Sequence, residues 1–396
     1  MRRLRIVFFS DIFTPYVSGV VTSIANFSRE LIARGHTVYL FTSKYEESGE
    51  HAVPGLNVIK LKPSRFFSNY PGFTTIALSN YGAVMKKLRE IKPDLIHTQM
   101  PTPAAWFNYL YAKKLGVPWV NTFHTVLPDI GEYIFVTRFI GKSLAHKGVD
   151  WWQRTYFNLN TAVVAPSESA KRELLRMGVR VPIEVISNGI DLNQFRPPPH
   201  GRPDHTGPVR FVFAGRVSNE KNIDVVVCAF ALVQPKLPGS TLSIVGGGPE
   251  QQALERLATQ LDVGQHVHFS GHMPYKDMAK QYAAHDVLVT ASMIETEGLT
   301  ILEAMACGLP VIGVNVLNIP FIVRHGVNGF IAPPKDPAAL AAHMETLGKD
   351  RSLIKQMGAH AMDVAKDYSL QRSTDVFEAF YRRLVLSNEE TTDKEK

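Results

Sequence analysis

Two acidic residues in the segment ETEGLTILEAMACGLPVIG, residues 295–313, have a spacing that bears on chemistry. Glu295 and Glu303 are separated by seven residues. In one continuous helix, eight steps of ~1.5 Å would place their backbones roughly 12 Å apart and about 80° apart around the axis. A retaining glycosidase needs its two carboxyl groups about 5 Å apart, so this spacing disfavours paired hydrolytic chemistry.

A different arrangement of these acids suits a ligand better. We expect Glu295 in the loop after a strand at 287–289, residues 298–300 at the start of a helix, and Glu303 in the first turn of that helix. Carboxylates so placed would hold opposite ends of a polyhydroxylated ligand, while the amides of Leu299 and Thr300 face a diphosphate. For isolated acids the alternative stays open that Glu303 serves the helix dipole and Glu295 caps a loop.

Further candidates follow other predicted strands, which is where open parallel sheets bind ligands. They are Gly19 after the first strand, His124 after a strand at 119–122, Arg216 and Lys221 after a strand at 210–214, and the triglycine 246–248 after a strand at 242–245. A glycine at a helix start lets the backbone approach an anion closely. The pattern therefore indicates an anionic ligand.

Several common catalytic motifs do not occur. Gly-Gly-Gly-Pro at 246–249 lacks the Gly-x-Gly-x-x-Gly spacing of dinucleotide enzymes, and a phosphate loop ending at Lys142 would need Gly where Val136 stands. No His-Glu-x-x-His, Gly-x-Ser-x-Gly or Cys-x-x-Cys is present. No zinc or serine-hydrolase site is therefore visible.

The elements that position these residues are short apolar runs alternating with helical segments. The runs lie at 5–9, 37–41, 95–97, 119–122 and 162–165, and again at 210–214, 242–245, 266–269, 287–289 and 311–312. Their continuous hydrophobicity predicts strands covered on both faces, hence parallel sheets flanked by helices, the α/β class.

The domain boundaries follow from composition. A Pro- and Gly-rich stretch predicts a linker at 191–208, between a first domain at 1–190 and a second at 209–369. A helical stretch at 370–386 is expected to return to the first domain, and residues 387–396 to form a frayed polar tail.

Composition limits the class of protein. A chain of 396 residues, 45% of them apolar, has room for two ordinary domains. Residues 1–196 hold 24 Lys and Arg against 14 Asp and Glu, whereas the remainder holds 19 against 22. This asymmetry fits either an anionic surface or ligand for the first half or a merely solvated basic face. Two cysteines and the lack of a long apolar run favour a cytoplasmic protein without a membrane span.

Taken together, the Glu-x7-Glu pair, the Arg-x4-Lys, the glycine loop and the histidine of the first domain resemble the family 4 retaining glycosyltransferases. The resemblance runs from residues 9–21 through SNGID at 187–191 to the segment quoted above, with one departure at Ser18, where many members have Gly. It implies the GT-B architecture, two Rossmann-like doubly wound domains facing across a cleft. It also implies transfer of a hexose from a nucleotide diphosphate sugar with retention and with no metal or cofactor.

The resemblance assigns expected roles residue by residue. Arg216 and Lys221 would bind the donor diphosphate, Glu303 the ribose, and Glu295 the transferred sugar. His124 would meet the sugar from the other domain. Further donor contacts are expected at Gly19, Gly271 and His272, and at Gly298, Leu299 and Thr300. A surface ion pair with Glu220 is the alternative for the two cations, and the role of Glu297 stays open.

The acceptor is expected from the segment after His124, which is similar in style to that of bacterial diacylglycerol glucosyltransferases. Its candidate acceptor contacts are Asp129, Glu132 and Tyr133. The candidate membrane contacts that follow are Arg138, Lys142, Lys147, Trp151 and Trp152. Basic side chains on one helix face with aromatic neighbours suit lipid headgroups. An ordinary amphipathic helix packed on its own domain is the alternative.

These expectations combine into one reading and two alternatives. We expect a peripheral enzyme on the inner face of the cell membrane that transfers a hexose, with UDP-glucose the favoured donor, to a membrane lipid such as diacylglycerol. Its partners would be the nucleotide sugar, an anionic membrane and the lipid, with no nucleic acid. A soluble transferase for a sugar or cell-wall oligosaccharide and a non-catalytic sugar-nucleotide-binding protein both stay open.

Overall fold

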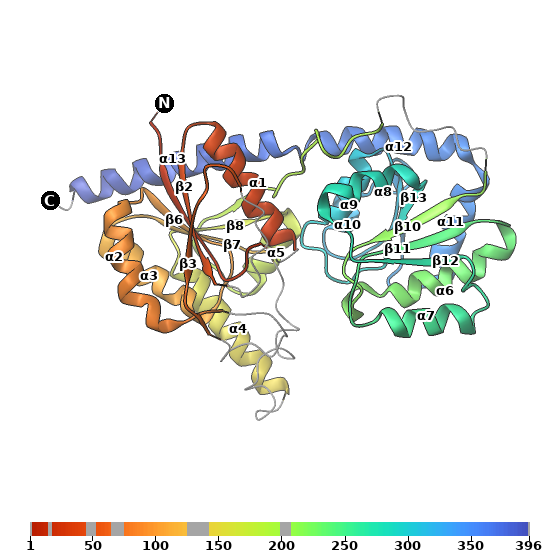
Figure 1. Cartoon of the computed structure of the whole chain (residues 1–396), viewed down its shortest axis with the longest axis horizontal. Coiled ribbons are helices and arrows are strands. Elements are labelled where there is room, and N and C mark those ends of the chain that lie inside the picture. Colours follow the sequence, from red (N-terminus) through yellow and green to blue (C-terminus); the bar gives the residue numbers. More distant parts are fainter. Residues whose placement is uncertain are drawn as a thin grey trace. The chain divides into compact units, whose positions relative to one another are not determined.

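The computed structural model describes residues 2–14, 18–44, 53–64, 75–124, 142–198 and 207–394, without the side chains of 142–147 and 392–394. The chain forms two compact units. Unit 1 comprises Met1–Asn188 and Gln371–Lys396, and unit 2 comprises Gly189–Leu370. Each unit has its own parallel sheet with helices on both faces (Figure 1). The α/β class predicted from the apolar runs is thus confirmed.

Unit 1 contains a seven-stranded sheet in the order β3-β2-β1-β6-β7-β8-β9. Its strands are β1 (Arg5–Ser10), β2 (Thr37–Ser43), β3 (Asn57–Leu61), β6 (Leu95–Thr98), β7 (Trp119–Thr122), β8 (Ala162–Ala165) and β9 (Ile183–Val185). All neighbours pair in parallel. The strand order reverses between β1 and β6, and ligands of doubly wound sheets bind at the carboxyl ends of the strands at such a switch point.

The helices of unit 1 cover both faces of this sheet (Figure 1). They are α1 (Gly19–Ala33), α2 (Tyr81–Ile91), α3 (Trp106–Leu115), α4 (Lys142–Asn158), α5 (Glu168–Arg176) and α13 (Leu370–Lys394), with the short 3-10 helices η1 (Leu78–Asn80) and η2 (Pro103–Ala105). The small strands β4 (Pro63–Ser64) and β5 (Thr75–Ile76) form a separate antiparallel pair. Phe377 of α13 packs edge-on against Phe27 of α1, with ring centroids 4.5 Å apart. The last helix therefore belongs to the core of unit 1.

Unit 2 repeats the plan with six strands in the order β12-β11-β10-β13-β14-β15. They are β10 (Arg210–Ala214), β11 (Thr241–Val245), β12 (Val267–Gly271), β13 (Val287–Val289), β14 (Val311–Val314) and β15 (Gly329–Ala332). The helices are α6 (Ile223–Val233), α7 (Gln251–Gln260), α8 (Met278–Ala284), α9 (Leu299–Ala306), α10 (Ile319–Ile322), α11 (Pro337–Lys349) and α12 (Arg351–Lys366), with the 3-10 helices η5 (Asn219–Lys221), η6 (Gln234–Lys236) and η7 (Tyr275–Asp277). Its switch point lies between β10 and β13.

The end of the chain differs from its prediction. Helix α13 continues through the stretch expected to fray and ends at Lys394. The extension contains no Gly or Pro that would stop a helix. Two of its side chains contact unit 1, because Asn388 Nδ2 donates to the Gly116 carbonyl at 2.7 Å and Glu389 Oε1 accepts from Arg2 Nη1 at 2.6 Å. These contacts favour the helix over a solvated tail.

Candidate active site

The switch point of unit 2 brings two of the predicted site residues into contact. Lys221 lies in η5 after β10, and Glu295 lies in the loop after the neighbouring strand β13. Lys221 Nζ donates to Glu295 Oε1 at 2.6 Å and to the Ile294 carbonyl at 3.2 Å. The two side chains are only 19% and 15% exposed. Because the pair is largely withdrawn from water, its attraction is stronger than that of an exposed pair.

This pairing differs from the alternative that the sequence left open. Glu220 Oε1 accepts from the Ser218 hydroxyl at 2.5 Å, and its carbonyl accepts from Met293 N at 3.0 Å. Lys221 instead pairs with the acid predicted to hold the sugar. Arg216 lies exposed in the loop that follows β10. The structure thus links one predicted phosphate-binding cation with the predicted sugar-binding acid through a direct ion pair.

Glu303 lies in the second turn of α9, not in its first turn as predicted. Gly298 takes a left-handed conformation, with φ 88°, and the helix begins only at Leu299. The Glu303 side chain is buried, and Tyr282 Oη donates to its Oε2 at 3.1 Å. Burial raises the pKa of Glu303 to about 7, although hydrogen bonds from Tyr282 and Tyr275 oppose the rise. Near neutral pH the Glu303 carboxyl group is therefore present in both its protonated and its ionised form.

The N-terminus of α9 carries no side-chain cap, because glycine stands at its N-cap position. A Cβ at Gly298 would meet Ile322 Cδ1 at 3.1 Å, in a backbone conformation that other residues rarely adopt. The amides of Leu299 and Thr300 begin the helix at this point, where its dipole favours an anion. The preceding residue, Glu297, is buried, and its carbonyl accepts from Asn318 Nδ2 at 2.8 Å.

The triglycine fixes the loops around this site. A Cβ on Gly246 would lie 1.8 Å from the Gly215 carbonyl oxygen, and one on Gly248 would lie 2.1 Å from that of Val217. Val217 N donates to the Gly247 carbonyl at 3.0 Å. The glycines are therefore required for a close approach of the triglycine to the loop that carries Arg216.

The loop after β12 joins the same cluster of strand ends. Gly246 N donates to the Gly271 carbonyl at 3.0 Å, so the triglycine also touches the residues predicted to border the nucleobase. Gly271 has φ 65°, and His272 is exposed. The ends of β10, β11 and β12 are thus held together by backbone hydrogen bonds.

In unit 1, His124 follows β7 as predicted, and its partner is Gln99, which follows β6. His124 Nε2 lies 2.8 Å from Gln99 Oε1. Gln99 is itself buried and donates from its backbone N to the Phe9 carbonyl at 2.8 Å. Burial lowers the pKa of His124 to about 4. The imidazole is therefore neutral at pH 7, and a proton on Nε2 leaves Nδ1 unprotonated.

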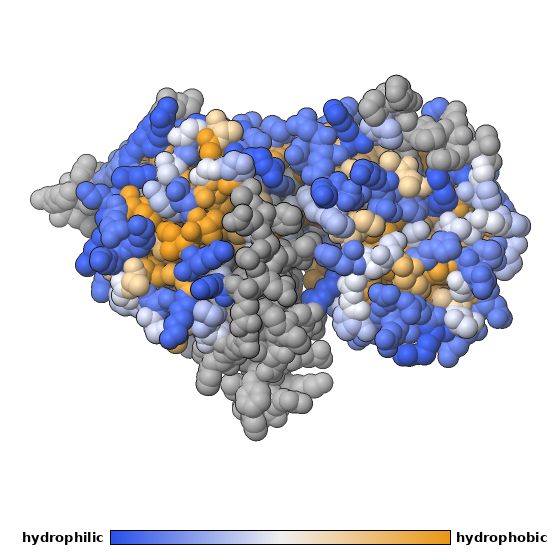
Figure 2. Space-filling model, in the orientation of Figure 1, coloured by the Kyte–Doolittle hydropathy of each residue, from blue (hydrophilic) through white to orange (hydrophobic). Residues whose placement is uncertain are grey.

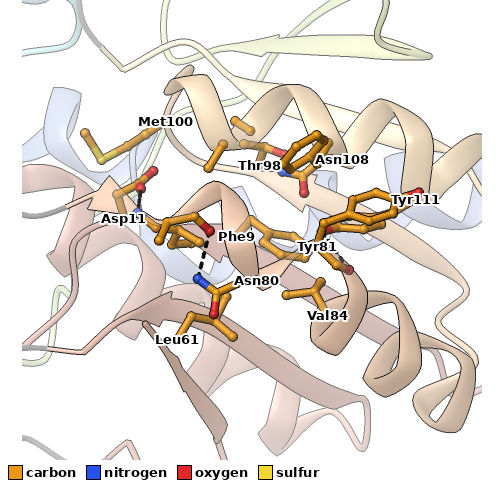
Figure 3. Close-up of a pocket in the computed structure, with 15 residues that line it drawn as sticks. Phe9, Asp11, Leu61, Asn80, Tyr81, Val84, Thr98, Met100, Asn108 and Tyr111 are labelled. Carbon is orange, nitrogen blue, oxygen red and sulfur yellow. Dashed lines mark hydrogen bonds between the residues drawn. The ribbon is translucent and has the colours of Figure 1, made fainter. Parts of the chain in front are cut away.

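A small pocket lies at the switch point of unit 1 (Figure 3). Its volume is about 20 Å³, room for about one water molecule. The lining includes the end of β1, at Phe9 and Asp11, and the end of β6, at Thr98 and Met100. Most of the remaining wall is apolar or aromatic and comes from β3, β5, α2 and α3. No motif in the sequence predicted this pocket.

Family models match most of the length of both units. The profile "Glycosyltransferase Family 4" matches residues 17–194, and "Glycosyl transferases group 1" matches residues 201–363. An alpha-monoglucosyldiacylglycerol synthase of Streptococcus pneumoniae is 31% identical over 78% of this chain and 70% of its own length. The chain belongs to the family 4 glycosyltransferases. It is a nucleotide-sugar hexosyltransferase, which confirms the resemblance seen in the sequence.

Further relatives support the glycosyltransferase assignment and its fold. An alpha-monoglucosyldiacylglycerol synthase of Acholeplasma laidlawii is 26% identical over 99% of this chain and 100% of its own length. Among solved structures, the sucrose-phosphate synthase of Thermosynechococcus elongatus superposes with a TM-score of 0.79 at 22% identity, covering 97% of this chain and 100% of the other. The GT-B architecture of this glycosyltransferase is therefore confirmed.

The one visible departure from the family pattern has a local structural role. Ser18 is the N-cap of α1, and its hydroxyl accepts from Val21 N at 3.3 Å. Gly19 is the first residue of the helix and is exposed. In this glycosyltransferase the serine therefore satisfies one amide at the helix start that a glycine would leave to solvent or ligand.

The acceptor and membrane predictions for this glycosyltransferase fall partly outside the described residues. Asp129, Glu132, Tyr133 and Arg138 lie outside them, as do the side chains of Lys142 and Lys147. On α4, Trp151 is 58% exposed. Trp152 is half-buried and stacks on Tyr156, with ring centroids 5.7 Å apart.

These placements separate the two tryptophans predicted to contact a membrane. The half-buried Trp152 fits the alternative in which this segment is an ordinary amphipathic helix packed on its own unit. Trp151, by contrast, is exposed to solvent. In the described ranges, no helix has both the length and the apolar character needed to cross a bilayer. Those ranges also contain no group of three or more His, Cys, Asp and Glu side chains arranged to hold a metal ion.

Proposed function

We propose that this glycosyltransferase moves a hexose, with UDP-glucose the favoured donor, to a membrane lipid such as diacylglycerol, with retention of the anomeric configuration. The observation that carries the proposal is the similarity, over at least 70% of each relative's length, to two enzymes named alpha-monoglucosyldiacylglycerol synthase. The basic first half of the chain and the exposed Trp151 support an acceptor at an anionic membrane.

The geometry of unit 2 supports the donor contacts that we propose. Arg216 and Lys221 bind the diphosphate, and the ion pair with Glu295 holds the Lys221 ammonium in a defined place before the donor arrives. Glu303, in its ionised form, accepts hydrogen bonds from the ribose hydroxyls. The uncapped start of α9 adds backbone amides to the phosphate grip. Gly19, Gly271 and His272 complete the proposed donor contacts.

The transfer step then needs no enzymatic nucleophile. The bond between the anomeric carbon and the diphosphate oxygen breaks while the acceptor oxygen bonds to the same face of that carbon, and the departing diphosphate takes the acceptor proton. Arg216 and Lys221 stabilise the charge that develops on the leaving group. Neutral His124 bonds a hydroxyl of the sugar near the reacting carbon, oriented by its hydrogen bond to Gln99.

The deciding experiment is a panel of donors assayed against vesicles. UDP-glucose, UDP-galactose and GDP-mannose are each offered with diacylglycerol in anionic phosphatidylglycerol vesicles and in neutral phosphatidylcholine vesicles, and the anomer of the product is assigned by NMR. We expect an α-glucosyl lipid, formed faster on anionic vesicles. Transfer to soluble sugars or cell-wall oligosaccharides but not to lipid would instead establish the soluble alternative, and a β-linked product would overturn retention.

A further inference from the structure

We infer that Asn318 is a positioning residue of the donor site, which holds the loop 294–297 so that Glu295 can bond the transferred sugar. This inference rests on the proposed function, because Glu295 is the proposed contact of that sugar. Asn318 is not itself one of the proposed donor contacts. It follows β14, the strand next to β13, and it therefore reaches the loop into which β13 leads.

Asn318 makes two hydrogen bonds to backbone carbonyls of this loop. Its backbone N donates to the Glu295 carbonyl at 3.3 Å, and its side-chain Nδ2 donates to the Glu297 carbonyl at 2.8 Å. The two bonds fix both ends of a three-residue segment. Lys221 Nζ meanwhile holds the Glu295 carboxylate at 2.6 Å. The backbone and the side chain of Glu295 are thus held by different elements of unit 2.

The Asn318 side chain serves this loop and not its own helix. Asn318 is the N-cap residue of α10, a position at which asparagine commonly bonds an amide of the helix that it begins. Its side chain makes no such capping bond. Figure 2 shows a largely hydrophilic surface on unit 2, whereas Asn318 is only 2% exposed. Because a buried amide group is costly unless it is hydrogen-bonded, the bond to Glu297 accounts for an asparagine at this place.

The residues on either side of Asn318 hold it in place. Ile319 and Ile322 of α10, which follow it, are fully buried. Leu317, which precedes it, has a left-handed backbone conformation with φ 45°, which is unfavourable for a residue other than glycine. Such a conformation persists only where the surrounding structure fixes it. Asn318 is therefore a firm anchor for the loop that it bonds.

The two bonds act on the sugar end of the proposed donor site rather than on its nucleotide end. Helix α9, which follows the loop, has its own anchor in the core, because Leu302 and Met305 are fully buried. Glu303, the proposed ribose contact, belongs to this helix. Loss of the Asn318 amide should therefore loosen Glu295 and leave the proposed nucleotide contacts of α9 in place.

The test measures binding in the absence of a lipid acceptor. Dissociation constants for UDP-glucose and for UDP are determined by calorimetry in wild type and in Asn318→Ala. We expect the constant for UDP-glucose to rise about 10-fold, the effect of losing one bond to a buried carbonyl, and that for UDP to stay within about 2-fold. Amide hydrogen exchange in peptides that cover 292–298 should become faster. Asn318→Ser, which keeps a hydroxyl donor, should show a smaller rise and serves if the alanine variant does not fold.

Asn328→Ala is the matched control. Asn328 is also fully buried, and its Nδ2 donates to the Ile322 carbonyl at 2.9 Å. It directly precedes β15, which is parallel to β14, and so it lies at the amino ends of the strands, away from the proposed site. The control should lose stability but keep both wild-type dissociation constants. Equal rises of the UDP-glucose constant in the two variants would make Asn318 a merely structural residue and overturn the inference.

A double-mutant cycle separates this inference from the proposed function. If Asn318 acts through Glu295, Asn318→Ala should add no further loss of UDP-glucose affinity to Glu295→Ala. Additive losses would overturn the positioning role, while the proposed sugar contact of Glu295 would stand. An unchanged UDP-glucose constant in Glu295→Ala alone would overturn that contact and the inference with it. Should the donor panel select UDP-galactose or GDP-mannose, that sugar nucleotide and its free nucleotide replace the pair.

Discussion

The switch points of the two units occupy the same place in similar sheets but carry different chemistry. In unit 2 the strand ends present an ion pair between Lys221 and Glu295 and a buried carboxyl group at Glu303. In unit 1 the neutral His124 follows β7, and Phe9 of β1 stacks with Tyr111 of α3. The fold supplies two equivalent positions for ligands, and the residues that follow each strand decide which ligand suits them. We propose that the sugar nucleotide binds at the first and that His124, at the second, acts on the transferred sugar.

The two switch points also differ in the hydrogen-bond donors that surround their buried carboxyl groups, Asp11 and Glu303. Burial raises the pKa of Asp11 to about 6 and that of Glu303 to about 7. Asp11 braces its own unit, because it accepts from the backbone N of Ile76 and from the Thr102 hydroxyl. Glu303 instead receives bonds from tyrosine hydroxyls, whose hydrogens can rotate when a ligand hydroxyl arrives. This difference supports a structural role for Asp11 and the proposed ligand role for Glu303.

The largest expected effect tests whether charged side chains at the switch point of unit 2 are needed for transfer. Lys221→Ala removes the cation that is proposed to stabilise the leaving diphosphate, and it leaves Glu295 without its partner to repel the donor. We expect kcat/KM to fall about 1000-fold, with the circular dichroism spectrum unchanged.

Lys236→Ala, which breaks an exposed pair with Glu345, is the matched control and should stay within 2-fold or so of wild type. Similar losses in both variants would remove the special role of Lys221.

A second prediction concerns how firmly the loops of unit 2 are held. Gly246→Ala places a Cβ 1.8 Å from the Gly215 carbonyl, so the loops must separate. We expect a loss of about 3 kcal/mol or more in the free energy of unfolding of unit 2, measured by urea denaturation. Gly264→Ala is the control, since its Cβ would meet no atom closer than 3.5 Å, and should change stability little. Equal stability of the two variants would show that the loops are not closely held.

The third prediction tests the role of unit 1. His124→Ala should lower kcat about 100-fold while the dissociation constant for UDP, measured by calorimetry, stays unchanged, because His124 is proposed to bond the transferred sugar and not the nucleotide. Gln99→Leu should lower kcat less, since it removes only the hydrogen bond that orients the imidazole. The control is His268→Ala, an exposed position on β12. A rise in the UDP dissociation constant for His124→Ala would argue that His124 serves the nucleotide rather than the transfer step.

The sequence predicted every interior strand of the two large sheets but only one of their four edge strands, β12. The strands that it missed in the two large sheets, β3, β9 and β15, all lie at sheet edges. Four of the five residues of β3 are at least partly exposed, and so is all of β9. An edge strand is covered less completely, so it lacks the continuous apolar run by which the interior strands were recognised. The signal was absent for a physical reason.

The sequence likewise predicted only part of the candidate site. The rule that ligands bind after parallel strands singled out His124, Lys221 and Glu295, because each lies just beyond an apolar run. The partners that define their chemistry were not predictable. Gln99 lies 25 residues before His124, and Tyr282 lies 21 residues before Glu303. Such pairs form only when separate elements of the fold become neighbours, and no local pattern in the sequence indicates them.

The smallest expected effect distinguishes the roles of the buried carboxyl groups through pH. The pKa of Glu303 lies above its ordinary value, so its contribution to stability is complete below about pH 4.5 and is lost as the pH rises through about 7. Donor binding has the opposite sign, because only the ionised form accepts two hydroxyl bonds. From pH 8 to pH 6 the ionised fraction falls about 10-fold, and the affinity for UDP should fall with it.

The variant Glu303→Gln separates this effect from other titrating groups. Its amide oxygen still accepts from Tyr282, but the group carries no charge at any pH. We expect weaker UDP binding that no longer changes between pH 6 and pH 8, together with a higher melting temperature at pH 8, where ionised Glu303 costs the wild type stability. A pH dependence unchanged by the substitution would place the titration elsewhere. Glu303 would then be a structural carboxyl group like Asp11, and the contrast between the two switch points would rest on the Lys221–Glu295 pair alone.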